Sequence, residues 1–288
     1  MAQLESKYTT PKAGRNLPAA IGVALMLFLP IAVGLIWIPW LFIITVGILL
    51  SIGVAEVSHA LRLKNMQAET GIIVVGSALS VIGGYWVTSM PELGVSSMTF
   101  IVSCLGGTVL AAFVGRLFRG GSEGFLRDVA ASSFLIAYLP LLGVFVALLM
   151  APDNGPLRVA TLILCVVASD TGAYATGVLF GKNKMAPSIS PSKTWEGFAG
   201  AVAWSSGIGV VCSILMLGID WWMGLILGAV VAAAATVGDL LESLIKRDAG
   251  IKDMSNILPG HGGVMDRLDS MLMAFPVGWF VLNIAMGS

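Results

Sequence analysis

The sequence is poor in charged residues. Of its 288 residues, 11% are Asp, Glu, Lys or Arg, whereas about 25% is usual in a soluble domain. A soluble globule of this size needs far more charge to cover its surface. Hydrophobic residues make up 57%, and the formal net charge is zero, so the chain has no overall field that attracts a polyanion. This composition excludes a water-soluble enzyme, a disordered chain and a nucleic-acid-binding protein with a basic face. A polytopic membrane protein remains.

Cysteine is also scarce. Cys104, Cys165 and Cys212 lie in separate apolar runs without CxxC pairing. We therefore expect small buried hydrophobic residues, not metal ligands or disulfide partners. A cleavable signal peptide is not expected either. Residues 1–16 are polar, and the apolar stretch from Leu17 is too long for the hydrophobic region of such a peptide.

What the chain has instead is a series of long apolar stretches. A bilayer core about 30 Å thick requires about 20 apolar residues in a transmembrane helix. We therefore predict an all-α, polytopic membrane protein. Its nine predicted transmembrane helices are residues 17–36, 39–60, 71–89, 95–114, 129–150, 157–180, 197–218, 221–242 and 268–286. The chain divides into an N-terminal transmembrane bundle, residues 1–160, and a more polar region, residues 161–288, with loops at 182–196 and 243–267.

Lysine and arginine are distributed unevenly between the two sets of loops that alternate along the chain. Fifteen of the sixteen fall in one set, and Arg158 alone falls in the other. The fifteen are Lys7, Lys12, Arg15, Arg62, Lys64, Arg116, Arg119, Arg127, Lys182, Lys184, Lys193, Lys246, Arg247, Lys252 and Arg267. Positive residues in short loops are retained in the cytoplasm. The distribution predicts a cytoplasmic N-terminus, a C-terminus on the opposite side and two cytoplasmic polar loops.

The first half of the chain contains few groups with chemical function. Residues 17–150 are typical of packed bundle helices, with small residues at the contacts. Glu56 and His59 are exceptions near the end of the second span, where a polar helix end at the membrane interface is favoured over a substrate contact. The basic, glycine-rich loop from Arg116 to Asp128 is compatible with binding of anionic lipid head groups or with a solvated turn.

The sixth predicted span contains the sequence SDTGAY at residues 169–174. Its Asp170 is a functional candidate, because an ionisable residue within a membrane span is energetically expensive. The alternative is a hydrogen-bonded packing residue. In the loop that follows, Ser192 and Lys193 offer donors suited to phosphate oxygens. Trp195 is compatible either with stacking on a base or with an ordinary interfacial position.

Polar residues are denser at the end of the eighth predicted span. Asp239, Glu242 and Ser243 are spaced so that they fall on one helix face, and Lys246 continues that face. A charged stretch follows, running from Lys246 to residue 261. We expect this face and this stretch to form part of a site at the membrane edge.

Two further carboxylates open the ninth predicted span. Asp266 and Asp269 are three residues apart, so both point to one side. Together with Asp239 they would repel one another unless cations lay between them. Oxygen ligands favour a hard ion such as Mg²⁺, which leaves coordination positions for substrate phosphates. Gly262 and Gly263 allow main-chain N–H groups to approach an anion. This pattern predicts a metal–phosphate site in preference to solvated ion pairs.

The segment from Ser243 to Asp269, SLIKRDAGIKDMSNILPGHGGVMDRLD, resembles the signature of the phosphatidate cytidylyltransferases, also called CDP-diacylglycerol synthases. It matches that pattern with its spacing intact, and a pattern of this length with so many charges and glycines is highly specific. The segments SDTGAY and PSKTWEG also look like that family. The resemblance covers about residues 169–270, whereas the first 160 residues contribute only the expected hydropathy.

The resemblance implies the reaction CTP + phosphatidate → CDP-diacylglycerol + diphosphate, in phospholipid biosynthesis. Catalysis would combine metal neutralisation with in-line displacement at the α-phosphorus of CTP. We assign Asp239, Asp266 and Asp269 to Mg²⁺, with a second cation of unknown identity, and Asp170 to the metal shell or to orienting a ligand. The other candidate catalytic and substrate-binding residues are Ser192, Lys193, Trp195, Ser243, Lys246, Arg247, Lys252, His261, Gly262, Gly263 and Arg267.

Two other functions are alternatives. A CTP-dependent lipid kinase or another nucleotide–lipid transferase would release a nucleoside diphosphate in place of diphosphate. A secondary transporter would use Asp170 and Asp239 near the bilayer midplane, but these carboxylates cluster toward helix ends. The expected partners are CTP, phosphatidate and membrane lipids, with a homodimer as a compatible assembly and no nucleic acid. The expected location is the inner cell membrane, with the site facing the cytoplasm.

Overall fold

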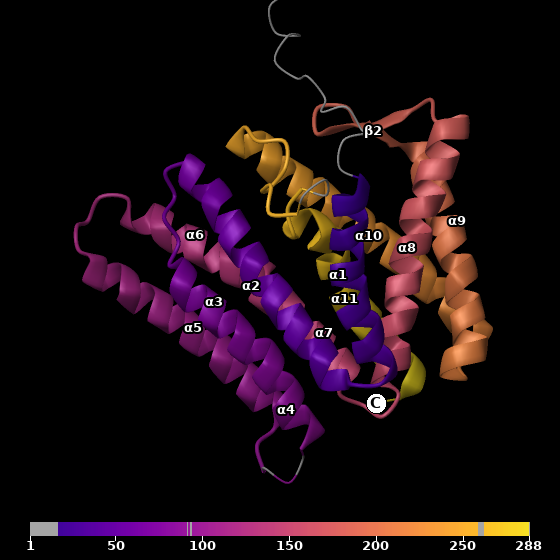
Figure 1. Ribbon diagram of the computed structural model, residues 1–288, viewed down its shortest axis with the longest axis horizontal. Coiled ribbons are helices and arrows are strands. Elements are labelled where there is room, and N and C mark those ends of the chain that lie inside the picture. The colour runs from indigo at the N-terminus through magenta and orange to yellow at the C-terminus, as the bar shows by residue number, and fades with distance from the viewer. Residues whose placement is uncertain (1–16, 91, 93, 259–261, 288) are drawn as a thin grey trace, which may run out of the picture.

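The computed structural model describes residues 17–90, 92, 94–258 and 262–287, and it is almost entirely helical (Figure 1). Its longer elements are α1 (Leu17–Ile36), α2 (Pro39–Leu63), α5 (Ser97–Arg119), α8 (Gly155–Phe180), α9 (Trp195–Cys212), α10 (Trp221–Ala249) and α11 (Met265–Met286). The shorter ones are α3 (Thr70–Ala78), η2 (Leu79–Gly83), α4 (Gly84–Ser89), α6 (Phe125–Tyr138), α7 (Pro140–Met150) and η4 (Ser213–Leu217). Strands β1 (Lys184–Ala186) and β2 (Ser190–Thr194) form an antiparallel hairpin.

The predicted all-α membrane architecture is confirmed. Within the described residues, eight helical segments are long and apolar enough to cross a bilayer. They are Pro39–Leu63, Thr70–Ser89, Ser97–Arg119, Phe125–Met150, Gly155–Phe180, Trp195–Leu217, Trp221–Ala249 and Met265–Met286. The first predicted span coincides with α1, in which Leu25–Ile36 forms a shorter apolar helix. The orientation of the chain in the membrane stays a prediction.

Three of the predicted spans are composite, and one of them, Trp195–Leu217, consists of α9 and the π-helical turn η4. The segment Thr70–Ser89 consists of α3, the π-helical turn η2 and α4. The segment Phe125–Met150 consists of α6 and α7, which meet where Pro140 occupies the first turn of α7. Because proline has no N–H to donate to the preceding turn, it ends one helix and begins the next.

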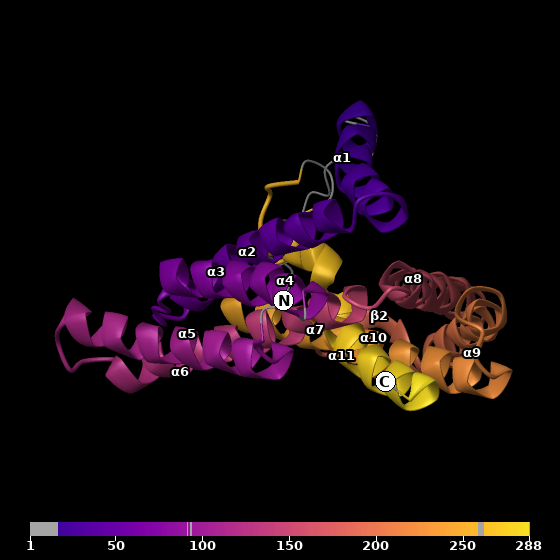
Figure 2. The same ribbon diagram turned by 90° about the horizontal axis from the view of Figure 1, so that it is seen from below.

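Helix α11 lies in the middle of the fold. Figure 1 shows α5 and α6 on one side of the molecule and α8 and α9 on the other. Helix α11 contacts α10, α7, α8 and α2, and so connects the two halves of the chain. Figure 2 shows that α1 stands away from the other helices, and it packs chiefly on α2. The helix that begins with Asp266 and Asp269 is therefore held from several sides.

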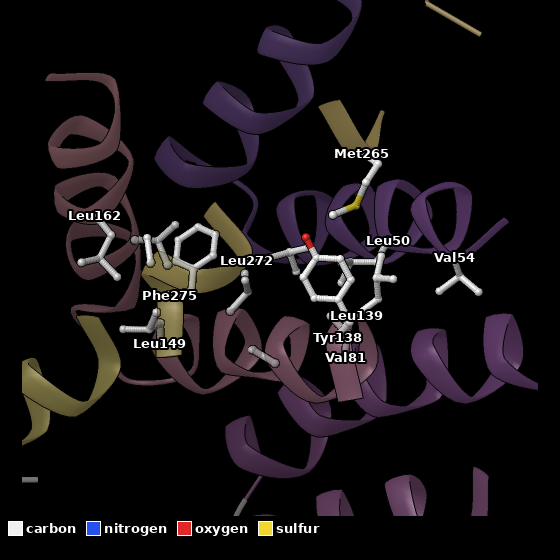
Figure 3. Close-up of a cluster of buried hydrophobic side chains, with 14 of the residues drawn as sticks. Leu50, Val54, Val81, Tyr138, Leu139, Leu149, Leu162, Met265, Leu272 and Phe275 are labelled. Atoms are coloured by element: carbon white, nitrogen blue, oxygen red, sulfur yellow. The ribbon is translucent and has the colours of Figure 1, made fainter. Parts of the chain in front are cut away.

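A buried apolar cluster joins the two halves beneath the polar ends of the helices (Figure 3). Its buried members come from α2, α3, η2, α4, α5, α6, α7, α8, η4, α10 and α11 and from the segments between them. The labelled residues are Leu50, Val54, Val81, Tyr138, Leu139, Leu149, Leu162, Met265, Leu272 and Phe275. Between membrane helices such close packing replaces the hydrophobic effect as the main attraction. The cluster thus fixes α11 against the N-terminal bundle.

Glycine brings α8, α9 and α10 into close contact. A Cβ atom added at Gly209 in α9 would lie 2.1 Å from the carbonyl oxygen of Gly224 in α10. A Cβ atom at Gly172 in α8 would lie 2.7 Å from the carbonyl oxygen of Gly200 in α9. Small residues at such crossings let helix backbones approach. These contacts assemble the helices that flank the polar loops.

The structure revises both loop boundaries. Helix α10 continues to Ala249, so the second loop begins only at Gly250 and ends before Met265. The first loop contains the β1–β2 hairpin, and α9 begins at Trp195. Both revisions have the same cause: the polar residues at these membrane edges still form regular backbone hydrogen bonds.

The three cysteines are free, as the sequence predicts, with Cys165 and Cys212 buried and Cys104 partly buried.

Candidate active site

Four aspartates from three helices line one cavity. Asp170 comes from α8, Asp239 from α10, and Asp266 and Asp269 from the first turns of α11. The cavity has a volume of about 280 Å³ and is also lined by Arg267. Residues separated by as much as 99 positions in the sequence thus face one space. All four carboxylates are among the residues predicted for the site, and the structure brings them together around this cavity.

A glycine allows Asp239 and Asp269 to come close. Gly238, which precedes Asp239, packs directly against the backbone of α11. A Cβ atom at Gly238 would lie 2.3 Å from the carbonyl oxygen of Asp269, a separation that no real side chain tolerates. The close approach of α10 and α11 at this point therefore depends on glycine, and it determines the distance between the two aspartates.

Two lysines pair with the carboxylates. Lys193 in β2 donates a hydrogen bond from its Nζ to Asp239. Lys246 in α10 donates to Glu242, one turn earlier, and to Oδ1 of Asp266 over 2.7 Å. Glu242 is buried. The lysines reduce the mutual repulsion of the acidic groups and supply ammonium groups beside the cavity.

A second cavity of about 390 Å³ adjoins the first, because Asp170 and Asp239 line both. Its other walls come from α8, the hairpin, the start of α9 and α10. They are Ser169, Ala173, Tyr174, Gly177, Val178, Met185, Ser192, Lys193, Thr194, Gly197, Phe198 and Thr236. The segments SDTGAY and PSKTWEG therefore form one pocket, which combines hydroxyl groups and an ammonium group with apolar walls.

The start of α9 is tightly organised beside this second cavity. Thr194 caps the helix, since its Oγ1 accepts a hydrogen bond of 3.1 Å from the N–H of Gly197. A Cβ atom at Gly197 would lie 3.0 Å from the carbonyl oxygen of Ala173 in α8. Capping and close packing together hold Lys193, which immediately precedes Thr194, at the mouth of the cavity.

Gly262 and Gly263 lie against the carboxylate of Asp266. The N–H of Gly263 donates to Oδ2 of Asp266 over 2.7 Å, and the N–H of Met254 donates to the same oxygen over 3.2 Å. Gly262 has a φ of +80°, and a Cβ atom there would lie 2.9 Å from that oxygen. The sequence predicts that these glycines approach a substrate anion. In this structure the anion that Gly263 contacts is a carboxylate of the chain itself.

The environment of Glu56 differs from the predicted one. The sequence favours a polar helix end at the membrane interface, but only 3% of Glu56 is exposed. Its carboxylate accepts hydrogen bonds from the hydroxyl of Ser255 and from the N–H groups of Val264 and Met265. The signal available in the sequence was the carboxylate itself, because a charge within an apolar helix requires a partner. His59, by contrast, is exposed.

Several predicted site residues lie outside the two cavities. Trp195 is 56% exposed and packs edge-on against Phe198, so it lines neither cavity. Arg247 donates to the carbonyl oxygen of Ile189 over 3.3 Å and ties the hairpin to α10. Lys252 is exposed. Ser243, Lys246, Gly262 and Gly263 also line neither cavity. The predicted His261 lies outside the described residues.

A structural ion pair joins the end of α5 to the start of α6. Arg116 is buried and donates to Oδ2 of Asp128 over 2.8 Å, and its other N–H groups donate to the carbonyl oxygens of Gly120, Gly121 and Glu123. This guanidinium is therefore fully engaged within the chain, which argues against a role for Arg116 in binding lipid head groups.

The oxygen ligands around the first cavity are of the type that a hard cation prefers. The cavity is lined by four carboxylates, and Oε1 of the neighbouring Glu242 is buried without a hydrogen-bond partner among the described residues. Oxygen-only donors of this type are those that Mg²⁺ prefers. In the conformation described, no three acidic, histidine or cysteine groups of the described residues converge tightly enough to hold an ion. Two of these carboxylates, Asp239 and Asp266, form salt bridges with Lys193 and Lys246.

Comparison with known proteins identifies the family of the chain. Residues 19–285 match the sequence model of the cytidylyltransferase family. A phosphatidate cytidylyltransferase of Mycobacterium leprae is 37% identical over 98% of this chain and 93% of its own length. One from Mycobacterium tuberculosis is 37% identical over 96% of this chain and 85% of its own length, and one from Staphylococcus epidermidis is 32% identical over 92% and 95%. The chain therefore belongs to the cytidylyltransferase family.

Proposed function

We propose that this membrane enzyme transfers the cytidylyl group of CTP to phosphatidate, giving CDP-diacylglycerol and diphosphate. The observation that carries the proposal is the convergence of Asp170, Asp239, Asp266 and Asp269 around one cavity that adjoins a second, lysine-bearing cavity. The similarity to phosphatidate cytidylyltransferases over nearly the whole chain supports the identity of the two substrates.

The reaction is a displacement at the α-phosphorus of CTP. An oxygen of the phosphatidate phosphate forms a new bond to that phosphorus, and the bond from the α-phosphorus to the diphosphate breaks. The attacking oxygen is already anionic, so no strong general base is required. The main barrier is the repulsion between two polyanions, which positioning and charge neutralisation reduce.

The acidic residues have a distinct role in this proposal. Asp239, Asp266 and Asp269 would hold Mg²⁺, and Asp170 would complete the shell or orient a ligand. Bound Mg²⁺ supplies neutralisation of the triphosphate charge. A second cation stays a prediction. The carboxylates would also repel the phosphates of CTP from their own positions, because the charges are alike.

The basic residues bind the phosphates directly. Lys193 and Lys246 are paired with Asp239 and Asp266 in the structure. We infer that each lysine exchanges its carboxylate contact for a phosphate oxygen when CTP binds. Arg267 lines the first cavity and supplies a further cation. The exchange keeps the number of charge-assisted hydrogen bonds nearly constant, so little energy is lost on binding.

The site is inferred to face the cytoplasm of the inner cell membrane. The support is the concentration of Lys and Arg in the loops that carry it. CTP would arrive from the aqueous side, and phosphatidate would reach the same edge by lateral diffusion among the membrane lipids. A homodimer stays a prediction.

The experiment follows the label of CTP into the lipid. Purified protein in detergent is incubated with phosphatidate, Mg²⁺ and CTP labelled at either the α- or the γ-phosphate. Cytidylyl transfer places the α-label in the lipid phase and releases the γ-label as diphosphate. A lipid kinase would instead place the γ-label in the lipid, and a transporter would place neither there. Either of the last two results would refute the proposal.

A further inference from the structure

Glu56 is a buried carboxylate outside both cavities, and it lies against the N-terminus of α11. Its oxygens accept hydrogen bonds from the N–H of Met265 over 2.7 Å and from the N–H of Val264 over 3.0 Å. The hydroxyl of Ser255 donates to the same carboxylate. Glu56 belongs to α2, about 200 residues earlier in the chain. One side chain therefore ties the N-terminal bundle to the signature segment.

The contact satisfies a specific need of α11. The first N–H groups of a helix have no partners within the helix, and they carry partial positive charge. Val264 precedes the first residue of α11 and provides no side-chain cap. Glu56 supplies that cap from another helix, with a charge of the sign that the helix terminus favours. The first turn of α11 is thus held by α2 and not only by its own sequence.

The first two turns of α11 carry two residues of the proposed site. Asp266 follows Met265 directly, and Asp269 lies one turn further. Gly263 lies between the two carboxylates: a Cβ atom there would be 2.9 Å from both oxygens of Glu56 and 3.1 Å from Oδ2 of Asp266. Asp266 accepts the N–H of Gly263, while Glu56 accepts the next two N–H groups. Together the two carboxylates accept hydrogen bonds from three consecutive backbone N–H groups, those of residues 263–265.

We propose that Glu56 is a positioning residue for cytidylyl transfer, holding the described residues 254–258 and 262–265 so that Asp266 and Asp269 face α8 and α10. The inference rests on the function proposed above for this site. Glu56 lines neither cavity and touches no substrate in this account. It acts through the backbone of Val264 and Met265. The loss of its charge should change the geometry of the site more than the stability of the fold.

The test compares three variants of the full-length enzyme in detergent. Glu56→Gln keeps the size of the side chain but replaces an acceptor oxygen with an NH₂ group, which cannot accept the helix N–H groups. Ser255→Ala removes one of the donors and leaves the helix cap. Glu69→Gln is the matched control, because Glu69 is also an acidic side chain at the polar end of a helix and pairs with Arg119 away from the cavities.

Two measurements separate positioning from general stability. The kcat is measured well below the melting temperature of each variant, and amide hydrogen exchange is followed by mass spectrometry without substrate. We expect Glu56→Gln to lower kcat at least tenfold and Ser255→Ala two- to fivefold. Exchange should become faster in residues 254–265 in both variants and stay unchanged in α5 and α6. Glu69→Gln should keep kcat within twofold of the wild type.

Each contrary result has a defined meaning. A kcat within twofold of the wild type in Glu56→Gln, or unchanged exchange in residues 254–265, would overturn the inference. Faster exchange throughout α5 and α6 would also overturn it, because the role would then be general stability. If Glu56→Gln does not fold, Ser255→Ala decides by the same criteria. The exchange measurement needs no catalysis, so a wild-type enzyme without transfer activity would refute the proposed function without touching this result.

Discussion

Lys193 in strand β2 and Asp239 in helix α10 form a hydrogen-bonded ion pair that joins the hairpin to the transmembrane helices. Both residues line the second cavity, and Asp239 also lines the first. The pair therefore lies at the boundary between the two spaces. A phosphate group placed there would compete with Asp239 for the ammonium group of Lys193.

Removal of Lys193 should weaken the use of CTP. Lys193→Ala deletes the ammonium group that we expect to bind a phosphate, so kcat/KM for CTP should fall at least tenfold, about 1.4 kcal/mol of transition-state stabilisation. The melting temperature should change little, because Lys193 is partly exposed. Steady-state kinetics with CTP as the varied substrate measure the effect. Lys184→Ala, an exposed lysine in β1, is the control. An unchanged kcat/KM for Lys193→Ala would remove this residue from the site.

Substitution of the site aspartates should abolish most turnover. Asp239→Asn, Asp266→Asn and Asp269→Asn keep the shape of the side chain but remove charge that would hold Mg²⁺. Each should lower turnover at least about a hundredfold, roughly 2.7 kcal/mol. The measurement is a Mg²⁺ titration of activity for each variant. Asp248→Asn, at an exposed residue paired with Lys64, is the control.

The same three variants should differ in metal-free stability. Asp269 is buried and has no salt bridge to a described lysine, so Asp269→Asn should leave the melting temperature equal or slightly higher. Asp266→Asn should lower it, because Asp266 accepts from Lys246 and from two backbone N–H groups. Near-normal turnover of all three at ordinary Mg²⁺ would contradict the metal assignment. A large loss of stability in Asp269→Asn would indicate a structural role.

The contact between Gly238 and α11 should be sensitive to a single methyl group. Gly238→Ala would place a Cβ atom 2.3 Å from the carbonyl oxygen of Asp269 and force α10 and α11 apart. We expect a loss of about 1–3 kcal/mol in stability, as for other overpacked sites, and at least a tenfold loss in kcat. Thermal unfolding and steady-state kinetics provide the measurements. In the control Gly207→Ala, the added Cβ atom meets no described atom within 4 Å, so both quantities should be nearly unchanged. If the two variants have the same stability and the same kcat, the close contact between α10 and α11 is not required.

The predicted orientation can be tested by chemical labelling. In a background with the three native cysteines replaced, Ser188→Cys and Asn256→Cys introduce exposed thiols in the two polar loops. Asp153→Cys introduces one in the connection between α7 and α8. A membrane-impermeant maleimide should label Asp153→Cys in intact cells and the other two only after permeabilisation. Labelling of Ser188→Cys or Asn256→Cys from outside would reverse the topology and the cytoplasmic placement of the site.

Much of this protein follows from local sequence. The eight long apolar helices found among the described residues match predicted spans, because bilayer thickness sets the length of an apolar run whatever surrounds it. Asp239 could be selected from helical spacing, and Asp266 and Asp269 from spacing and from the resemblance of one contiguous segment. The helix ends were less predictable. Helix α10 continues to Ala249 through a charged stretch, since Lys246 pairs with Glu242 within the helix.

The contacts between distant segments were decided by the tertiary structure. Hydropathy places Glu56 near a helix end but does not indicate that α2 lies against the start of α11, where the carboxylate caps two N–H groups. Similarly, spacing suggests that Gly263 approaches an anion, whereas the fold supplies Asp266 as that anion. The sequence by itself therefore determined which segments are long and apolar enough to cross a membrane and which residues are candidates for the chemistry, because both depend on short stretches. Which donor meets which carboxylate depends on how helices some 200 residues apart pack together, and only the folded chain decides that.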